Sequence, residues 1–118
     1  MGKSGNSIIL FMGTYPPREC GIATFTKDLS SAMDKKFNPK LKSRVIALNE
    51  STGFYNYSNK VLMQLNKDDI EDYISIAKQI NLSRNIKLVC IQHEFGIFGG
   101  MRGDYLLAFL EVLEKPAI

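Results

Sequence analysis

The sequence predicts an α/β protein with a doubly wound, mainly parallel sheet and helices on both faces. Apolar and β-branched runs of strand length alternate with segments whose apolar residues recur every three or four positions, which is typical of strand–helix–strand units. The composition, 45% hydrophobic and 23% charged, is that of a globular protein rather than a disordered chain. With 118 residues, the chain is long enough to form one domain with a single core.

The first strand and the first helix are separated by a proline-bearing loop. Residues 7–13 (SIILFMG) form an apolar run that indicates a strand buried on both faces. Residues 14–21 must be irregular, because two consecutive prolines hold the backbone extended and disfavour helix before them. The next segment is predicted to be a helix that ends at an Asn-Pro pair, and its apolar stripe consists of Ile22, Phe25, Leu29, Ala32, Met33 and Phe37.

Two short strands follow, joined by a connection that carries aromatic residues. Residues 43–48 (SRVIAL) and 60–65 (KVLMQL) are predicted to be the second and third strands. The polar connection between them contains Tyr55 and Tyr57. These tyrosines either cover the core or line a pocket, and core cover is the favoured interpretation.

The second helix begins in an acidic segment. Its cap is predicted at Asn66 or Asp68, and the acidic residues of its first turns match the positive end of a helix dipole. Its apolar stripe consists of Ile70, Tyr73, Ile74, Ala77 and Ile80.

The last third of the chain contains a central strand, a glycine-rich loop and an apolar helix. Residues 86–92 are predicted to be a strand buried on both faces. A helix over residues 104–113 is apolar nearly all round and would need cover on more than one side. Residues 117–118 look like the opening of another strand. Because a domain seldom stops at such a point, we expect residues 1–118 to be the front part of a longer protein.

The candidate site lies where the central strand ends. The only histidine of the chain, His93, follows the apolar strand and precedes a glycine-rich loop. In an open parallel sheet, the carboxyl ends of the strands border the crevice in which ligands bind. Gly21 lies just before the first turn of the first helix, where free backbone N–H groups can hold phosphate or carboxylate. If the first and central strands are neighbours, right-handed crossovers bring Gly21 and His93 to one cleft.

Arg18 and His93 each have a purely structural interpretation beside the functional one. Arg18 is either a bidentate donor to an anion or an exposed residue on a rigid loop, and residue types alone do not decide between the two. A lone histidine is more often a packed or solvated residue than a catalytic one, but the position of His93 at a strand end favours function. His93 and Glu94 point to opposite sides of an extended backbone, so we do not expect an acid–base pair.

The glycine-rich loop has the same two interpretations. Its glycines either make turns or let backbone approach a ligand. Phe95 directly precedes these glycines and Phe98 lies among them; both are expected to be exposed and would suit contact with a sugar or a lipid. The glycines concerned are Gly96, Gly99 and Gly100.

Charge and cysteine content exclude several classes of protein. The net charge is only +3, and no aromatic residues interleave with the lysines, so nucleic acid is not an expected partner. The lysines between residues 27 and 42 are interpreted as a solvated face, with weak attraction to anionic surfaces as the alternative. Cys20 and Cys90 form neither a disulfide framework nor a metal cluster, so we expect no metal site. Without a signal peptide or a membrane-length apolar run, we expect a cytoplasmic protein.

Two segments resemble a known enzyme family. Residues 15–29 (YPPRECGIATFTKDL) and residues 91–100 (IQHEFGIFGG), with residues 103–107 (GDYLL) behind them, are similar to the amino-terminal domain of bacterial family-4 glycosyltransferases of GT-B fold. The similarity is greatest to the mannosyl- and glucosyltransferase branch, and it covers the whole chain in order.

The resemblance implies a retaining, metal-independent transfer of a hexose from a nucleotide-diphosphate sugar to an acceptor, without a cofactor. The acceptor would be a glycan, a lipid-linked sugar or a small molecule. In this family two Rossmann-like domains face each other across a cleft, and the front domain mainly holds the acceptor. By the resemblance, His93 would hydrogen-bond the donor sugar or its phosphate, while Gly21, with Arg18 nearby, would approach the diphosphate. The residues expected along the acceptor side are Tyr15, Glu94, Phe95, Gly96, Gly99 and Gly100.

The second domain of this family is absent from the 118 residues. It supplies the basic groups for the diphosphate and the glutamates for the nucleotide. Because stabilisation of the leaving group is usually the largest catalytic effect, we expect these residues alone to transfer no sugar and to bind a nucleotide sugar weakly. The expected partners of the full-length protein are the donor, the acceptor, the C-terminal domain of the same chain and a peripheral membrane contact.

Two other functions are weighed against this one. A flavodoxin-like regulatory or docking module of receiver type would carry clustered carboxylates after the first strand, where this chain has residues 13–16 (GTYP). A small hydrolase would need a GxSxG elbow, or a serine or cysteine placed to use His93 as a base, and neither is apparent.

Overall fold

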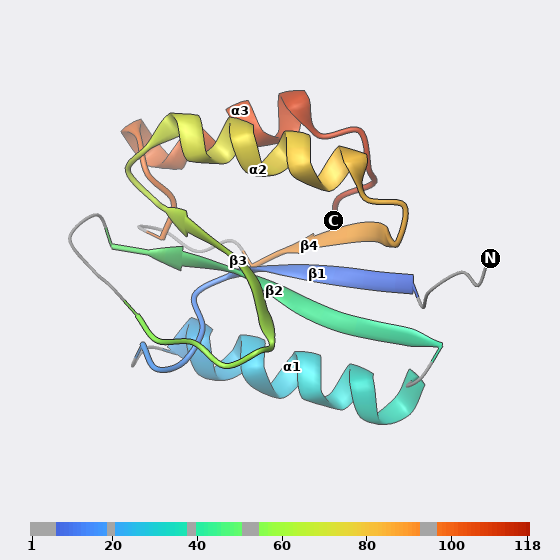
Figure 1. Cartoon of the computed structure of the whole chain (residues 1–118). Coiled ribbons are helices and arrows are strands. Elements are labelled where there is room, and N and C mark those ends of the chain that lie inside the picture. The colour runs from blue at the N-terminus through green and yellow to red at the C-terminus, as the bar shows by residue number, and fades with distance from the viewer. Residues whose placement is uncertain (1–6, 19–20, 38–39, 51–54, 93–96) are drawn as a thin grey trace.

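The computed structural model describes residues 7–18, 21–37, 40–50, 55–92 and 97–118. These residues form a four-stranded, all-parallel sheet with α1 on one face and α2 and α3 on the other (Figure 1). In chain order the elements are β1 (Ser7–Gly13), α1 (Gly21–Phe37), β2 (Leu41–Asn49), β3 (Val61–Asn66), α2 (Ile70–Leu82), β4 (Ile86–Ile91), the short 3-10 helix η1 (Met101–Gly103) and α3 (Tyr105–Val112). The predicted α/β class with a parallel sheet is confirmed.

The strands lie in the order β3-β2-β1-β4, so the chain winds outward from β1 in both directions. A further strand also begins beside β4, as predicted. Ala117 forms a parallel bridge with Val89, and the backbone N–H of Ile118 donates to the carbonyl of Val89 at 3.0 Å. This order is that of the first half of a Rossmann-type sheet; a flavodoxin-type sheet would place the third strand next to the first.

The core is divided by the sheet into two layers. Successive residues of a strand point to opposite faces, so Leu10 and Met12 of β1 contact α2 and α3, whereas Phe11 belongs to the smaller cluster on the α1 side. The predicted burial of β4 on both faces is wrong. Lys87 is exposed and Cys90 is only half-buried, because α1 packs over β1 and β2 rather than over β4.

The predicted apolar stripe of α1 is only partly correct. Phe25 is 53% exposed, and Ala32 and Phe37 are exposed as well. The side chains that α1 buries are small ones: Ala23, Thr26 and Ser30. Small residues let a helix lie close to a sheet, and the hydroxyls of Thr26 and Ser30 are satisfied by carbonyls of the preceding turn, those of Ile22 and Lys27.

The cap of α2 is Asp69 rather than Asn66 or Asp68. Its carboxylate accepts from the backbone N–H of Glu71 at 3.0 Å, while the side chain of Asn66 accepts from the backbone N–H of Asp68 in the preceding turn. Within the predicted stripe, Tyr73, Ala77 and Ile80 are buried and Ile74 is half-buried, but Ile70 is largely exposed and Ile76 takes a buried position instead.

The apolar helix predicted over residues 104–113 is α3. It packs against α2, which covers that side of it within the described part of the chain. Leu106 and Phe109 are buried there, but Leu107 is 65% exposed, so the predicted cover on more than one side is not present among these residues. Asn81 ties the end of α3 to α2: its amide donates to the carbonyl of Val112 and its oxygen accepts from the backbone N–H of Glu114.

Tyr73 joins three segments of the α2 side. Its hydroxyl donates to the carbonyl of Lys67, which follows β3, at 2.8 Å and accepts from the N–H of Gly99 at 3.0 Å. The ring of Tyr105 packs against it edge-on, with the ring centroids 5.8 Å apart. Burial is the main reason that the pKa of Tyr73 is raised to about 12.

We expect Tyr73→Phe to lower the free energy of unfolding by about 1–3 kcal/mol, because it leaves a buried N–H and a buried carbonyl without their partner. The folded pKa lies above the unfolded value of about 10, so the contribution of Tyr73 is complete below pH 10 and is lost as the pH rises towards 12. Urea unfolding of both proteins from about pH 7 to about pH 12, a range that includes the unfolded and folded pKa values of Tyr73, measures both effects. The matched control is Tyr105→Phe, which removes a hydroxyl that makes no hydrogen bond within the described residues. Equal stability of the two variants would contradict the role given to the Tyr73 hydroxyl.

Candidate functional site

The carboxyl ends of β1 and β4 lie side by side, as the predicted cleft requires. Met12 pairs with Ile91, and the backbone N–H of Gln92 donates to the carbonyl of Met12 at 2.9 Å. The loops from β1 to α1 and from β4 to η1 therefore leave the sheet at neighbouring points, where the direction of winding reverses. His93 follows Gln92 in the chain but lies outside the described residues, as do Glu94, Phe95 and Gly96.

Gly13, the last residue of β1, allows three elements to converge at this point. A Cβ atom placed on it would lie 3.1 Å from Cβ of Gln92 and 3.3 Å from Oγ1 of Thr26. The end of β1, the end of β4 and the second turn of α1 thus meet around a residue that has no side chain. Sequence reasoning gave no role to Gly13 or Thr26; a glycine at the end of a buried strand was the available signal.

Gly21 is the first residue of α1, and it is exposed. No described atom outside its immediate neighbourhood comes within 4 Å of a Cβ atom placed there, so packing does not require a glycine at this position. The backbone N–H groups of the first helical turn have no carbonyl partner within the helix and carry the positive end of its dipole. This end of α1 can therefore receive an anionic group, and the open space at Gly21 leaves room for it.

Arg18 is held by the chain itself rather than left free. Its guanidinium donates to the carbonyl of Leu48 and to the carboxylate of Glu50, both at 2.9 Å, and lies 5.7 Å from the ring centre of Tyr55. Glu50 is also 3.7 Å from the ammonium group of Lys67, so one carboxylate bridges two cations beyond the ends of β2 and β3. Arg18 thus fixes the loop after β1 to the end of β2. Sequence reasoning missed Glu50 and Lys67, which are distant from Arg18 along the chain.

Tyr15 faces the core on the α1 side. It is 6% exposed and belongs to the cluster that contains Phe11 and Val45. Burial raises the pKa of its hydroxyl, although a hydrogen bond with Ser58 acts in the opposite direction. Tyr57 packs against the same cluster, which agrees with the favoured interpretation of that tyrosine as core cover.

Two of the predicted cleft glycines have structural reasons to be glycine. Gly99 is buried, and a Cβ atom placed on it would lie 1.7 Å from the carbonyl oxygen of Lys67. Gly100 has a φ of 83°, a conformation that side chains disfavour. The expectation that Phe98 is exposed is wrong: it is 4% exposed and belongs to the core on the α2 side, because the chain after β4 returns over that layer.

Within the described residues, no three side chains are grouped as metal ligands. None of the helices described is long and apolar enough to cross a membrane. Comparison of the chain with protein-family models, with curated proteins and with solved structures found no match. The functional assignment therefore depends on the residues themselves and on their arrangement.

Substitution by alanine should affect the stability of the protein much more at Gly99 than at Gly21. We expect Gly99→Ala to lower the free energy of unfolding by about 3 kcal/mol or more, because the new methyl group overlaps the Lys67 carbonyl. Gly21→Ala should change it by less than about 1 kcal/mol, since the space is open and alanine favours helix. Chemical unfolding of the two variants under identical conditions tests this, and a similar loss for both would show that Gly21 is required by packing after all.

Proposed function

We propose that this chain is the N-terminal, acceptor-side domain of a retaining, metal-independent glycosyltransferase of the GT-B type. The full-length protein would transfer a hexose from a nucleotide-diphosphate sugar to a carbohydrate acceptor, in the cytoplasm and with a peripheral membrane contact. The observation that carries the proposal is the convergence of β1, β4 and the second turn of α1 around Gly13. Both sequence segments that resemble the family, residues 15–29 and 91–100, begin close to this point.

In the proposed site, the end of α1 and the loop after β4 address the same donor molecule. The backbone N–H groups at the start of α1 would hydrogen-bond diphosphate or sugar oxygens, and the helix dipole would favour their negative charge. His93 would hydrogen-bond the donor sugar near the reacting carbon. Gln92, the residue before His93 in the chain, lies against Gly13, which in turn adjoins Thr26 in the second turn of α1.

The charges of the described residues support a reaction in which a second domain takes part. Arg18 is paired with Glu50, and Lys67 lies close to the same carboxylate, so both cations near the carboxyl edge are partly neutralised. Departure of a nucleoside diphosphate needs strong positive charge to stabilise it. In the proposed enzyme this charge comes from the C-terminal domain, and the 118 residues alone transfer no sugar.

The strand order favours this proposal over a flavodoxin-like regulatory module. A flavodoxin-type sheet places the third strand beside the first, whereas here β3 lies at the edge, next to β2. The end of β1 also lacks the clustered carboxylates of receiver domains.

The test is a substitution of His93 in the full-length protein, assayed against a panel of nucleotide sugars. We expect His93→Ala to lower kcat by about a hundredfold or more, as is typical when a group that contacts the reacting centre is removed. Lys78→Gln is the control, because Lys78 is exposed on α2, away from the β1–β4 edge. Activity of His93→Ala within about twofold of the control, with a correctly folded protein, would contradict the proposal.

A further inference from the structure

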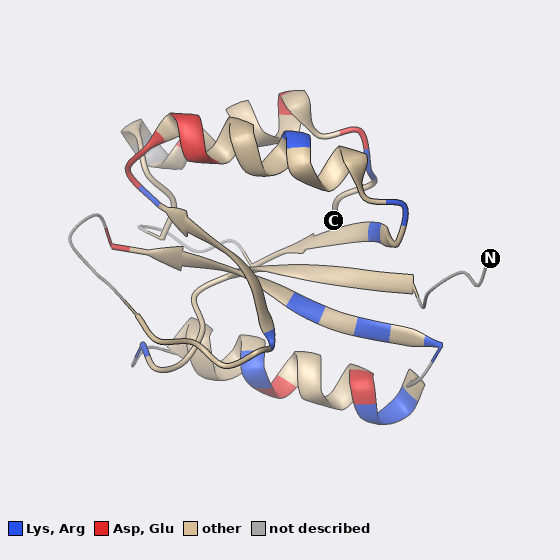
Figure 2. Ribbon diagram, in the orientation of Figure 1, with Lys and Arg blue, Asp and Glu red and all other residues tan. Residues whose placement is uncertain are grey.

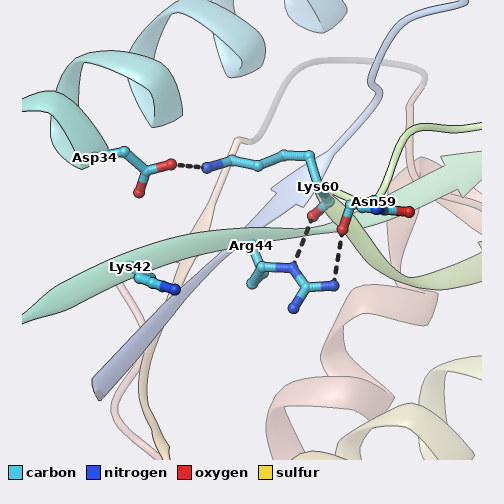
Figure 3. Close-up of a pocket in the computed structure, with 5 residues that line it drawn as sticks. All are labelled: Asp34, Lys42, Arg44, Asn59 and Lys60. Carbon is cyan, nitrogen blue, oxygen red and sulfur yellow. Dashed lines mark hydrogen bonds and ion pairs between the residues drawn. The ribbon is translucent and has the colours of Figure 1, made fainter. Parts of the chain in front are cut away.

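A pocket is present at the edge of the sheet, near the amino-terminal half of β2. A pocket of about 370 Å³ opens there, lined by Asp34, Lys42, Arg44, Asn59 and Lys60 (Figure 3). It lies away from the carboxyl ends of β1 and β4, so it is separate from the proposed transfer site. Figure 2 shows that Lys and Arg residues gather along this part of β2 and at the end of α1.

The register of the sheet creates this pocket. Val45 of β2 pairs with Val61 at the start of β3, so the residues of β2 before Val45 have a strand on the β1 side only. Lys42 and Arg44 are two residues apart and therefore project from the same face of the strand. In Figure 3 both cationic groups lie on one side of β2.

Arg44 is fixed in place by backbone carbonyls. Its Nε donates to the carbonyl of Lys60 at 3.3 Å, and one terminal nitrogen donates to the carbonyl of Asn59 at 2.8 Å. These partners are neutral, so among the described residues the charge of Arg44 is not paired with a carboxylate, and no further hydrogen bond of its guanidinium is present. A guanidinium held in this way loses little conformational freedom when it binds a ligand.

The one carboxylate of the pocket is already matched. Asp34 forms an ion pair with Lys60 and accepts from the backbone N–H and the hydroxyl of Ser43. Burial would raise the pKa of Asp34, but the hydrogen bonds from Lys60 and Ser43 lower it overall, so the carboxylate stays ionised at neutral pH. No acidic side chain among the described residues pairs with Lys42 or Arg44, which leaves two positive charges in the pocket.

We propose that this pocket binds a phosphate monoester or inorganic phosphate, with Lys42 and Arg44 as its ligands. An ammonium and a guanidinium group on one face match the two charges and the several acceptor oxygens of a phosphate group. The volume is at the lower end of the range for small-molecule sites and exceeds what a lone phosphate fills. The site therefore suits a small phosphorylated compound or the headgroup of phosphatidic acid. It does not depend on the proposed transferase activity.

The competing explanation is that these charges only protect an exposed strand edge from pairing with other chains. That role needs no ligand, and any cation along the edge would serve it. Lys40, which is exposed just before β2 and does not line the pocket, is the matched control for this alternative.

The experiment is a titration of the 118-residue chain with inorganic phosphate at constant ionic strength, followed by backbone amide NMR shifts. We expect saturable shifts at residues 42–45 and 59–61. Lys42→Gln should weaken binding about tenfold, as for the loss of one charge-assisted hydrogen bond, whereas Lys40→Gln should change it by less than about twofold. Unchanged unfolding curves for both variants establish that the fold is intact.

A second arm identifies the source of the phosphate group. Vesicles of phosphatidylcholine with phosphatidic acid are compared with vesicles that contain phosphatidylserine instead. Binding of phosphate in solution supports a soluble ligand. Binding only to phosphatidic acid, lost in Lys42→Gln but not in Lys40→Gln, supports the lipid headgroup. Absence of saturable binding to either probe, or equal weakening by both substitutions, overturns the proposal and leaves edge protection as the role of these residues.

Discussion

The parallel pairing of β1 with β2 on one side and β4 on the other is the constraint on which the rest of this structure depends. It makes β1 the innermost strand, so its second half is buried on both faces, with Phe11 on the α1 side and Leu10 and Met12 on the other. It also puts the loops that follow β1 and β4 next to each other. Burial of these large apolar side chains stabilises the sheet, at about 1.5–3 kcal/mol for each one fully buried, and the same pairing positions the candidate site.

Where segments distant in the chain pack closely, a glycine lies at the contact. Gly13 lets the end of β4 and the second turn of α1 come together, and Gly99 lets the segment after β4 lie against the turn that follows β3. The hydroxyl of Tyr73 then joins Gly99 to Lys67. Gly21 differs from both, because nothing described packs against it.

The charged residues are organised separately at the two ends of the strands. At the carboxyl ends, Glu50 bridges Arg18 and Lys67, and this arrangement fixes the loop after β1. Beside the first half of β2, the single carboxylate is matched by Lys60, and two cations have no acidic partner among the described residues. Among the described residues, the carboxyl ends thus keep one cation in excess of Glu50, whereas the pocket beside β2 keeps two in excess of Asp34. This contrast is why an anion is expected in that pocket even without the transferase proposal.

The sequence alone determined the elements and the class of fold, because strand and helix periodicity, paired prolines and acidic first turns are local signals. It predicted β1 over its observed length and placed the candidate cleft at the ends of β1 and β4. Contacts between distant segments were decided by the tertiary structure: the inward face of α1, the buried position of Phe98, the pairing of Arg18 with Glu50, and the pocket around Arg44. These depend on strand register and on how closely a helix approaches the sheet, which no short stretch of sequence encodes.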